Sequence, residues 1–389
     1  MKISRHLLAG QQGVVLFSSL TILSVLLAVG IGVRTMLQND YKILANLRRG
    51  TEAFYYSVAG IEWSKSELGR TLILPPAPAN RTVSFQSGSF SISFMSPTSG
   101  GSLAASVVVR STGSLGASSH TIQAQLTKTY ELADAAISLR GNAATVNFGS
   151  SPILVSGADY DPATGNAVLG AKPRSAISVS DDSLRGLIQQ ALGNAPQAIL
   201  DSASASPGFA TSGYLPANSV TQLVNDLCAS AAAIVTVVPS SGALIFENQT
   251  WGTPSLPELR CFEGLAASGD AITIAGNNTG AGILVVRNAD LVLAGSCRWE
   301  GLIIITGGEV GLRVAGPSEK ETIGGVILNE TGSPTSNKAI LDIQGNIRLR
   351  FSRKTLARSA GLVSSATLEQ TAPVLPFVIS QNYWRTVTP

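Results

Sequence analysis

Residues 14–33 read VVLFSSLTILSVLLAVGIGV, 20 consecutive positions without a charged side chain. At about 1.5 Å of rise per residue, this run spans roughly 30 Å, the thickness of the hydrocarbon core of a bilayer. A cleaved secretory signal has a shorter apolar region that ends at small residues, whereas this run ends in VGIGVR. We therefore predict a transmembrane helix. Two Lys and Arg residues before the run and four close behind it leave its orientation open.

The helical pattern continues beyond the apolar run. Large apolar residues recur three, four or seven positions apart and form one stripe, and no proline occurs before Pro75. The sequence therefore predicts one continuous helix over residues 14–70, about 80 Å long. A helix that is half in lipid and half outside it is expected to pack against other helices through this stripe. The stripe residues are Leu37, Leu44, Leu47, Phe54, Val58 and Ile61.

Three short segments around the apolar run carry a family resemblance: residues 11–16 (QQGVVL), 46–49 (NLRR) and 53–62 (AFYYSVAGIE). They resemble the N-terminal region of PilX-type minor pilins, within the type IV pilin-like proteins. In that family a prepilin peptidase removes a short basic leader ending in Gly, and the apolar helix then packs into a filament. The resemblance implies a leader over residues 1–13, cleavage between Gly13 and Val14, and methylation of the new N-terminus. It also implies that residues 37–61 pack on neighbouring pilin-like subunits and that the pilus assembly machinery is a partner.

Two positions depart from the family pattern. Main pilins carry Glu at the fifth mature position, where this chain has Ser18. PilX-like sequences often read A-E-A-G where this chain has Ser57-Val58-Ala59-Gly60. Both departures remove an acid from the helix, and both point to an accessory subunit rather than a major one.

The segment over residues 71–131 has the pattern of a small antiparallel sheet. Pro75, Pro76 and Pro78 are expected to end the helix. Apolar residues then alternate with period two, and Ser-Gly and Gly-Gly pairs supply the turns. We expect three or four strands packed on the helix.

A short motif of alternating apolar residues followed by Gly recurs in residues 132–360. Its glycines Gly276, Gly295, Gly316 and Gly345 follow one another at intervals of 19, 21 and 29 residues. Short strands that end in Gly at such spacing predict a β-solenoid, in which each coil buries its inward side chains against the next. Because the spacing is irregular, a β-sandwich stays open as the alternative.

Two further segments complete the predicted architecture. Residues 181–237 carry helical spacing on both sides of a Ser/Gly/Pro-rich loop, which predicts a helical insertion into the solenoid. Residues 361–389 contain three prolines and are expected to form an extended strap. The predicted fold class is therefore α+β, with a long N-terminal helix, a small antiparallel sheet and a β-solenoid-like domain.

Composition excludes several classes of protein. Charged residues make up 13% of the chain, about half of the roughly 25% of an ordinary soluble domain, and the net charge is +3. No basic block could neutralise phosphates, so we expect no nucleic-acid partner. Two histidines and three cysteines supply little material for a zinc centre or a His-based catalyst. We therefore expect a non-enzymatic protein without a cofactor.

A few polar residues are candidates for a site, each beside a structural interpretation. Asp159 and Asp161 could bind calcium, although Asp residues before a proline also stabilise turns. Asp181 and Asp182 are expected to cap the following helix. Charged residues of the repeat region have no acidic cluster beside them and are expected on solvated outer faces, as with Arg313, Asp342, Arg348 and Arg350. His120 lies in a strand pattern without a nucleophile motif.

The three cysteines lie in the part of the chain that would be exported, where disulfides can form. We favour Cys228–Cys261, because this bond would join the helical insertion to the solenoid. Closing such a loop contributes about 3 kcal/mol in the chain-entropy model. Three buried apolar thiols are the alternative.

These observations lead us to expect a minor pilin-like subunit of a type IV pilus or related filament, with an assembly, tip or adhesion role. It would be a single-pass protein of the bacterial inner membrane with an exported periplasmic or cell-surface domain. Two alternatives stay open: a membrane-tethered solenoid that binds envelope polysaccharide or another surface ligand, and a solenoid enzyme that cleaves polysaccharide. Loss of residues 1–13 would distinguish the first function from the second.

Overall fold

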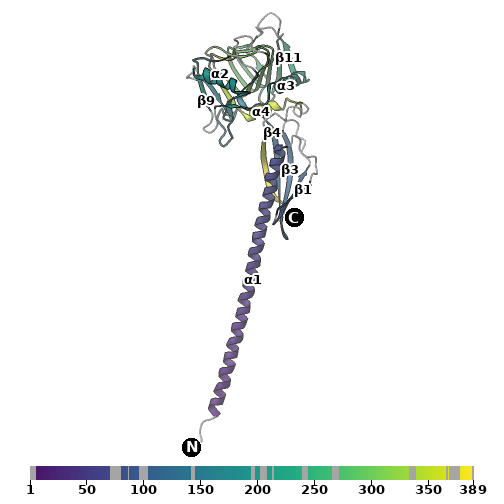
Figure 1. Ribbon diagram of the computed structural model, residues 1–389, viewed down its shortest axis with the longest axis vertical. Coiled ribbons are helices and arrows are strands. Elements are labelled where there is room, and N and C mark those ends of the chain that lie inside the picture. The colour runs from purple at the N-terminus through teal and green to yellow at the C-terminus, as the bar shows by residue number, and fades with distance from the viewer. Residues whose placement is uncertain are drawn as a thin grey trace.

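The protein has a long helix, a small sheet and a large β domain beyond them (Figure 1). This order confirms the predicted α+β class. The prolines expected to end the helix lie outside the described residues. The computed structural model describes residues 6–70, 80–85, 87–95, 104–141, 145–193, 198–201, 208–212, 214–238, 244–264, 271–332, 339–364, 367 and 377–387.

The helix and the small sheet form one unit, which we call the helix–sheet unit. Helix α1 (His6–Arg70) is continuous over 65 residues, as predicted, and its last turns lie on a five-stranded antiparallel sheet. Alternate strand residues such as Phe90, Ile92 and Phe94 face the helix and are buried with Ile61 and Leu68 of α1. The strands, in sheet order, are β1 (Asn80–Ser84), β2 (Ser89–Met95), β3 (Ala104–Leu115), β4 (Ser118–Tyr130) and β23 (Phe377–Val387).

The last strand of this sheet corrects the expected C-terminal strap. Strand β23 pairs antiparallel with β4, with Phe377 opposite Tyr130 and Val387 opposite Thr121. The C-terminal segment over residues 377–387 is therefore a strand of the small sheet, although it lies far from the other four strands in the sequence. Because these two strands are direct neighbours, the whole β domain is inserted between them.

The β domain is a solenoid built only from parallel strand pairs among its named strands. One sheet has the order β10-β8-β5-β20-β18-β16-β14-β11, and a second has the order β12-β15-β17-β19-β21-β6. This parallel pairing excludes the β-sandwich alternative, whose sheets are antiparallel. The strands that form successive coils are β14 (Glu258–Glu263), β15 (Ala271–Ala275), β16 (Asn277–Arg287), β17 (Asp290–Leu293), β18 (Ser296–Gly307), β19 (Leu312–Val314), β20 (Lys320–Glu330), β21 (Ala339–Ile343) and β22 (Ile347–Phe351).

The long strands β16, β18 and β20 turn a corner at a column of glycines. Gly282, Gly301 and Gly324 lie in register and have φ values of 127°, 144° and 146°, which side-chain-bearing residues rarely adopt. Before the corner β20 pairs with β22, and after it β20 pairs with β5. Each coil therefore has three faces, and the predicted Gly motif forms the third, where β15, β17, β19 and β21 stack in register.

The spatial order of the coils differs from their order in sequence. The first strands of the domain join its last ones, because β20 pairs with β5, β21 with β6 and β22 with β7. The chain builds outward from there to β10, crosses along the solenoid and restarts at β11. These strands are β5 (Ala135–Gly141), β6 (Thr145–Phe148), β7 (Ile153–Ser156), β8 (Ser175–Val179), β9 (Ala198–Asp201), β10 (Phe209–Thr211), β11 (Ala233–Val237), β12 (Leu244–Glu247) and β13 (Thr250–Trp251).

The predicted helical insertion is helical only in part. It contains α2 (Asp182–Gly193) and α3 (Ala217–Ala229), but β9, β10 and β11 are strands of the solenoid. Asp181 caps α2, since its carboxylate accepts hydrogen bonds from the backbone N–H of Ser183 at 2.9 Å and Leu184 at 3.0 Å. A further helix that the sequence pattern did not predict, α4 (Arg353–Ala360), contacts β16, β18 and β20 beside the glycine corner.

A buried ion pair lies where the chain enters the solenoid. Arg140 is completely buried and donates hydrogen bonds of 2.9 Å to both carboxylate oxygens of Asp134. Burial alone would raise the pKa of Asp134, but Arg140 and the hydroxyls of Ser212, Ser138 and Ser178 hold that pKa below its ordinary value. Neither charge is left without a partner, which is the condition under which a buried pair is tolerated.

Candidate functional site

Residues 14–49 of α1 contact no other element among the described residues. Every described residue from Val14 to Arg49 is exposed, and Figure 1 shows this part of the helix projecting away from the small sheet and the β domain. The helix contains a window long and apolar enough to cross a membrane, with a mean hydropathy of 2.5. The hydroxyls of Ser18, Thr21 and Ser24 donate to backbone carbonyls of the preceding turn at 2.8 Å. These polar groups are therefore satisfied without water, as an apolar surrounding requires.

The predicted packing stripe divides into two parts. Leu37, Leu44 and Leu47 are between 52% and 68% exposed. Ile61, expected on a neighbouring subunit, is instead buried at 4% exposure in the core of the chain's own sheet. This part of the expectation is wrong, because the strands of the small sheet cover the helix where the stripe reaches them.

The residues that hold α1 on the sheet are small, and the stripe of large residues did not predict them. Ala53, Ser57, Gly60 and Ser64 are buried at spacings of four, three and four, and therefore share one helix face. Opposite them is Gly113 of β3, where an added Cβ would lie 2.1 Å from the carbonyl oxygen of Ala53. Helix and strand backbones thus approach too closely for larger residues. The spacing of small residues was the sequence signal for this contact.

Beside this contact lies an apolar groove of about 250 Å³ between α1 and the strands β4 and β23. Phe54 lines it, with its ring 5.0 Å from the ring of His120 on β4 and 6.4 Å from that of Trp384 on β23. The groove continues the helix surface that carries Leu47 and Leu44. Its lining residues are Phe54, Val58, Ile61, Glu62, Ile122, Gln381 and Trp384.

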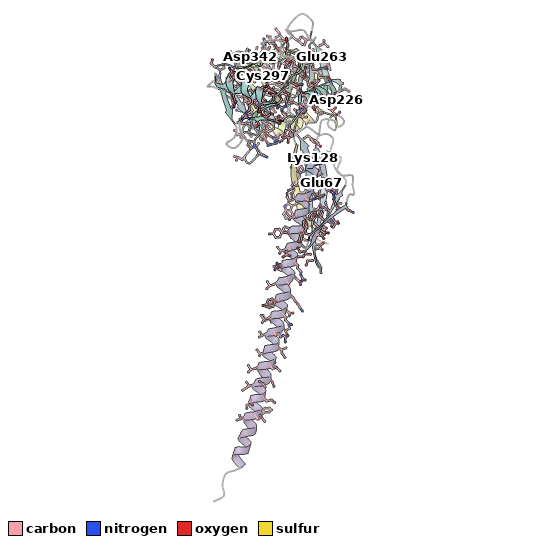
Figure 2. All side chains as sticks on the ribbon, in the orientation of Figure 1. Glu67, Lys128, Asp226, Glu263, Cys297 and Asp342 are labelled. Atoms are coloured by element: carbon pink, nitrogen blue, oxygen red, sulfur yellow. A yellow bond between two sulfur atoms is a disulfide. The ribbon has the colours of Figure 1, made fainter. Side chains whose placement is uncertain are left out.

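The C-terminal end of α1 is held by a lysine of the sheet. Lys128 of β4 is 2% exposed, and its ammonium donates a 2.7 Å hydrogen bond to the carbonyl of Leu68 (Figure 2 labels Lys128 beside Glu67). A positive charge is favourable at this end of a helix, where carbonyls lack partners. Burial lowers the pKa of Lys128.

The implied processing site lies inside the helix. The Gly13–Val14 peptide bond belongs to α1, which begins at His6. Residues 1–5 of the implied leader are outside the described residues.

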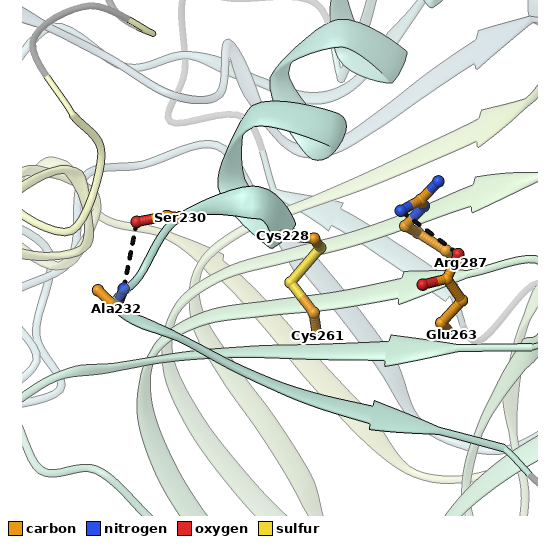
Figure 3. Close-up of a disulfide and its surroundings, with 6 residues drawn as sticks. All are labelled: Cys228, Ser230, Ala232, Cys261, Glu263 and Arg287. Carbon is orange, nitrogen blue, oxygen red and sulfur yellow. Dashed lines mark hydrogen bonds and ion pairs between the residues drawn. A yellow bond between two sulfur atoms is a disulfide. The ribbon is translucent and has the colours of Figure 1, made fainter.

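The structure joins Cys228 to Cys261, with a Cα–Cα distance of 5.8 Å (Figure 3). Cys228 lies in the last turn of α3 and Cys261 in β14, so the bond ties the helix that crosses the solenoid to one of its coils. The third cysteine, Cys297, is a buried free thiol. Burial raises its pKa to about 12, and only nearby Lys320 opposes this effect.

The two aspartates considered for calcium are bound to basic residues at the start of α4. Asp159 accepts from the backbone N–H of Arg353 at 2.9 Å and forms an ion pair with its guanidinium at 3.2 Å. Asp161 forms an ion pair of 3.0 Å with Lys354 and accepts from the backbone N–H of Ala163. Across the described residues no group of three or more metal-ligating side chains occurs. These carboxylates anchor a loop to a helix.

A polar groove of about 420 Å³ crosses the face of the solenoid formed by the first halves of β16, β18 and β20. Its central charge, Arg298, forms a 2.8 Å ion pair with Glu321 of the next coil. The arrangement offers hydroxyl, amide and charged groups in a row across successive coils. The lining residues are Asn277, Asn278, Thr279, Ser296, Cys297, Arg298, Glu319 and Glu321.

The structure separates the four charged residues of the repeat region. Arg313 lies on β19 and pairs with Asp290 at 3.2 Å, with Asp342 opposite it on β21. Arg348 lies on another face and pairs with Glu319 at 2.7 Å. Arg350 corrects the expectation of a solvated outer face, because its side chain is only 15% exposed beneath the ring of Tyr160.

No protein-family model and no curated protein matches the chain. Among solved structures, the chain is similar to the competence-associated pilin ComZ from Thermus thermophilus. That likeness has 13% sequence identity and a TM-score of 0.23, and it covers 87% of this chain and 97% of that chain.

Proposed function

We propose that the chain is a minor pilin-like subunit of a type IV pilus or related filament. In this proposal residues 14–33 hold it in the inner membrane until assembly, and the helix–sheet unit and solenoid form an exported head. The single observation that carries the proposal is the state of α1, which is exposed from Val14 to Arg49 and packed on its own sheet only beyond that point.

The length of the exposed helix favours a filament over a simple membrane tether. About 20 residues suffice to cross a bilayer, and the exposed part continues well beyond that span. The continuation carries Leu37, Leu44 and Leu47, all more than half exposed. Monomeric soluble proteins rarely expose a contiguous apolar surface of this kind, so a neighbouring helix is the partner that it suits.

The family resemblance supplies the accessory role. The implied fifth mature position is Ser18, which is uncharged and whose hydroxyl donates a 2.8 Å hydrogen bond to the carbonyl of Val14. It therefore offers no negative charge to the N-terminal amine of a neighbour. A bulky head on such a subunit suits the tip of a filament better than repeated positions along its shaft.

The test is the N-terminal residue and intact mass of the membrane-extracted protein, from cells with and without a prepilin peptidase. We expect a start at Val14 only when the peptidase is present. The Gly13→Val variant should remain uncleaved, and the matched Gly10→Val variant within the same leader should be cleaved normally. A start at Met1 in every case would reject the pilin pathway.

The polar groove favours a second candidate, a tethered solenoid that binds envelope polysaccharide. Its polar side chains lie at positions in register from coil to coil, Asn277 beside Ser296 and Thr279 beside Arg298. Neighbouring strands are about 4.8 Å apart, a spacing that can follow an extended chain. Binding of purified envelope polysaccharide to the full chain in detergent tests it. Thr279→Val should weaken binding several-fold, and Thr221→Val on α3 should not. Polysaccharide cleavage is the third candidate. Unchanged cleavage after substitution of Arg313, Asp342 and Arg348 would exclude these residues as catalysts, and no cleavage by the unmodified chain would exclude the candidate itself.

A further inference from the structure

The two ends of the solenoid are closed differently. At the end that carries β10, α2 fills the remaining side of the coil, where it contacts β6, β8 and β10 and buries Leu184, Ile188 and Ala191. At the other end the last strands are β11, β12 and β13, which we call the open end. Among the described residues no helix covers it. Solenoids generally need a cap at each end, because a terminal coil otherwise exposes its interior.

The open end exposes a group of aliphatic side chains. Ile234, Val235 and Val237 of β11 and Ile245 of β12 are between 45% and 59% exposed. One coil further in, the position in register with Val235 is Cys261, which is 1% exposed. The positions in register with Ile234, Val237 and Ile245 are the half-buried polar residues Arg260, Glu263 and Thr273. The terminal coil therefore carries exposed aliphatic side chains at positions where the next coil has charged or hydroxyl-bearing ones.

The backbone of the open end is also unpaired on its outer side within the described residues. β11 pairs with β14, β12 with β15 and β13 with β16, each through one edge. Proteins usually protect such edges with charges, prolines or bulges. β11 reads AIVTV and carries none of these.

We propose that the open end binds the open end of a second copy of this chain. A single extended segment could cover one edge, whereas another solenoid end of the same cross-section meets three edges at once. Because β11 is uncharged, its approach to a copy of itself brings no like charges together. Each open end is occupied by the other in this contact, so the association stops at two copies rather than forming a fibre.

The direction of α1 is compatible with this dimer. In Figure 1, α2 and β9 lie on one side of the head and β11 on the other, while α1 leaves the head from below. The open end therefore faces sideways relative to α1. A two-fold axis parallel to α1 would join two heads through their open ends and leave both helices pointing the same way, as one membrane requires. The inference does not depend on filament assembly.

The test measures the oligomeric state of the full chain in detergent micelles by light scattering over a range of concentrations. We expect a dimer whose dissociation constant rises about tenfold or more in Val237→Lys, because the interface would then bury an unpaired charge. Leu169→Lys, which changes an aliphatic residue that is 98% exposed elsewhere on the head, is the matched control and should leave the dimer unchanged.

Disulfide trapping locates the interface. Ile245→Cys should form a cross-linked product of twice the chain mass on oxidation in membranes, and Leu169→Cys should not. A dimer that survives Val237→Lys unchanged would place the contact elsewhere, for example between α1 helices, and overturn the proposal. A monomer at all concentrations, or a cross-link from Ile245→Cys to a different protein, would overturn it as well.

Discussion

The helix–sheet unit and the solenoid are stabilised by different means, although one chain forms both. The unit depends on a close backbone approach between small residues of α1 and Gly113 of β3. The solenoid depends on equivalent residues stacked from coil to coil, and its buried residues form a hydrophobic cluster separate from that of the unit. Two separate cores in one chain predict two unfolding transitions.

Each part contains its own fluorescent reporters, so the comparison can be tested directly. Trp63 and Trp384 belong to the helix–sheet unit, while Trp251 and Trp299 are buried in the solenoid. Replacing one pair by Phe leaves the other pair to follow its own part during denaturation. Coincident transitions in the two variants would contradict the division.

The largest effect is expected from Asp134→Asn in the solenoid. The substitution leaves Arg140 buried without its counter-charge, a loss that typically costs about 3–5 kcal/mol. Denaturant unfolding followed through Trp251 and Trp299 should record it, while the signal of Trp63 on α1 stays unchanged. The control is Glu52→Gln, which breaks an exposed ion pair with Arg48 and should leave the stability essentially unchanged, because solvent screens the two charges.

The same ion pair gives the solenoid a defined acid sensitivity. Because the folded-state pKa of Asp134 is lowered, its contribution is complete above the unfolded pKa of about 3.9 and is lost as the pH falls through the folded-state value. In Asp134→Asn this loss should be missing from the stability curve below pH 4. If both proteins lost the same stability below pH 4, the acid sensitivity would not come from Asp134.

The next effect is expected from the disulfide. Reduction should destabilise the solenoid by about 3 kcal/mol, because Cys228 and Cys261 close a loop with a sequence separation of 33. The Cys228→Ala/Cys261→Ala protein should show no further response to reductant. Since the pKa of Cys297 is raised to about 12, its thiol should resist alkylation at pH 8 until the solenoid unfolds.

A smaller effect, confined to the other part, is expected from Gly113→Ala. The new Cβ would lie 2.1 Å from one backbone atom of α1 and 2.4 Å from another, so helix and strand must separate. We expect a loss of about 1–3 kcal/mol from the helix–sheet unit, read through Trp63 and Trp384. Gly50→Ala, on the same helix with no atom near the added Cβ, should be neutral or slightly stabilising.

The smallest effect is expected from Lys128→Met at the end of α1. Because burial lowers the pKa of Lys128, the unfolded chain binds the proton more tightly, and stability rises with pH between the folded-state pKa and about 10.4. The variant should lose this rise and change stability near neutral pH by less than about 1 kcal/mol, since a lost hydrogen bond offsets relieved burial. If the stability of the variant still rises with pH in this range, another titratable group causes the rise.

Local periodicity made much of the fold predictable from the sequence. The continuous helix, the alternating strands and the Gly-terminated coil motif each repeat within a few residues, and all three occur in the structure. The fifth strand β23 and the pairing of β5 with β20 were not predictable in this way. Both join segments far apart in the chain, and a single sequence carries no pairing signal over such distances.

The candidate site likewise has residues that the sequence predicted and residues that it did not. The exposed Leu37, Leu44 and Leu47 follow from helical spacing alone. The buried Ile61 and the stripe of Ala53, Ser57 and Gly60 depend on which face meets the sheet, and only the small size of those residues indicated it. The pairing of Cys228 with Cys261 is the one that the sequence favoured, chosen because it joins an insertion to its host.

Because the solenoid is inserted between β4 and β23, completion of the groove beside α1 is coupled to the folding of the solenoid. The groove beside α1 takes Gln381 and Trp384 from β23, a strand that reaches the sheet only after the chain has passed through every coil. Until the solenoid folds and brings Phe377 back to Tyr130, that wall of the groove is missing. In the proposed filament, a subunit would thus present a complete surface to its neighbour only when its distant domain has matured.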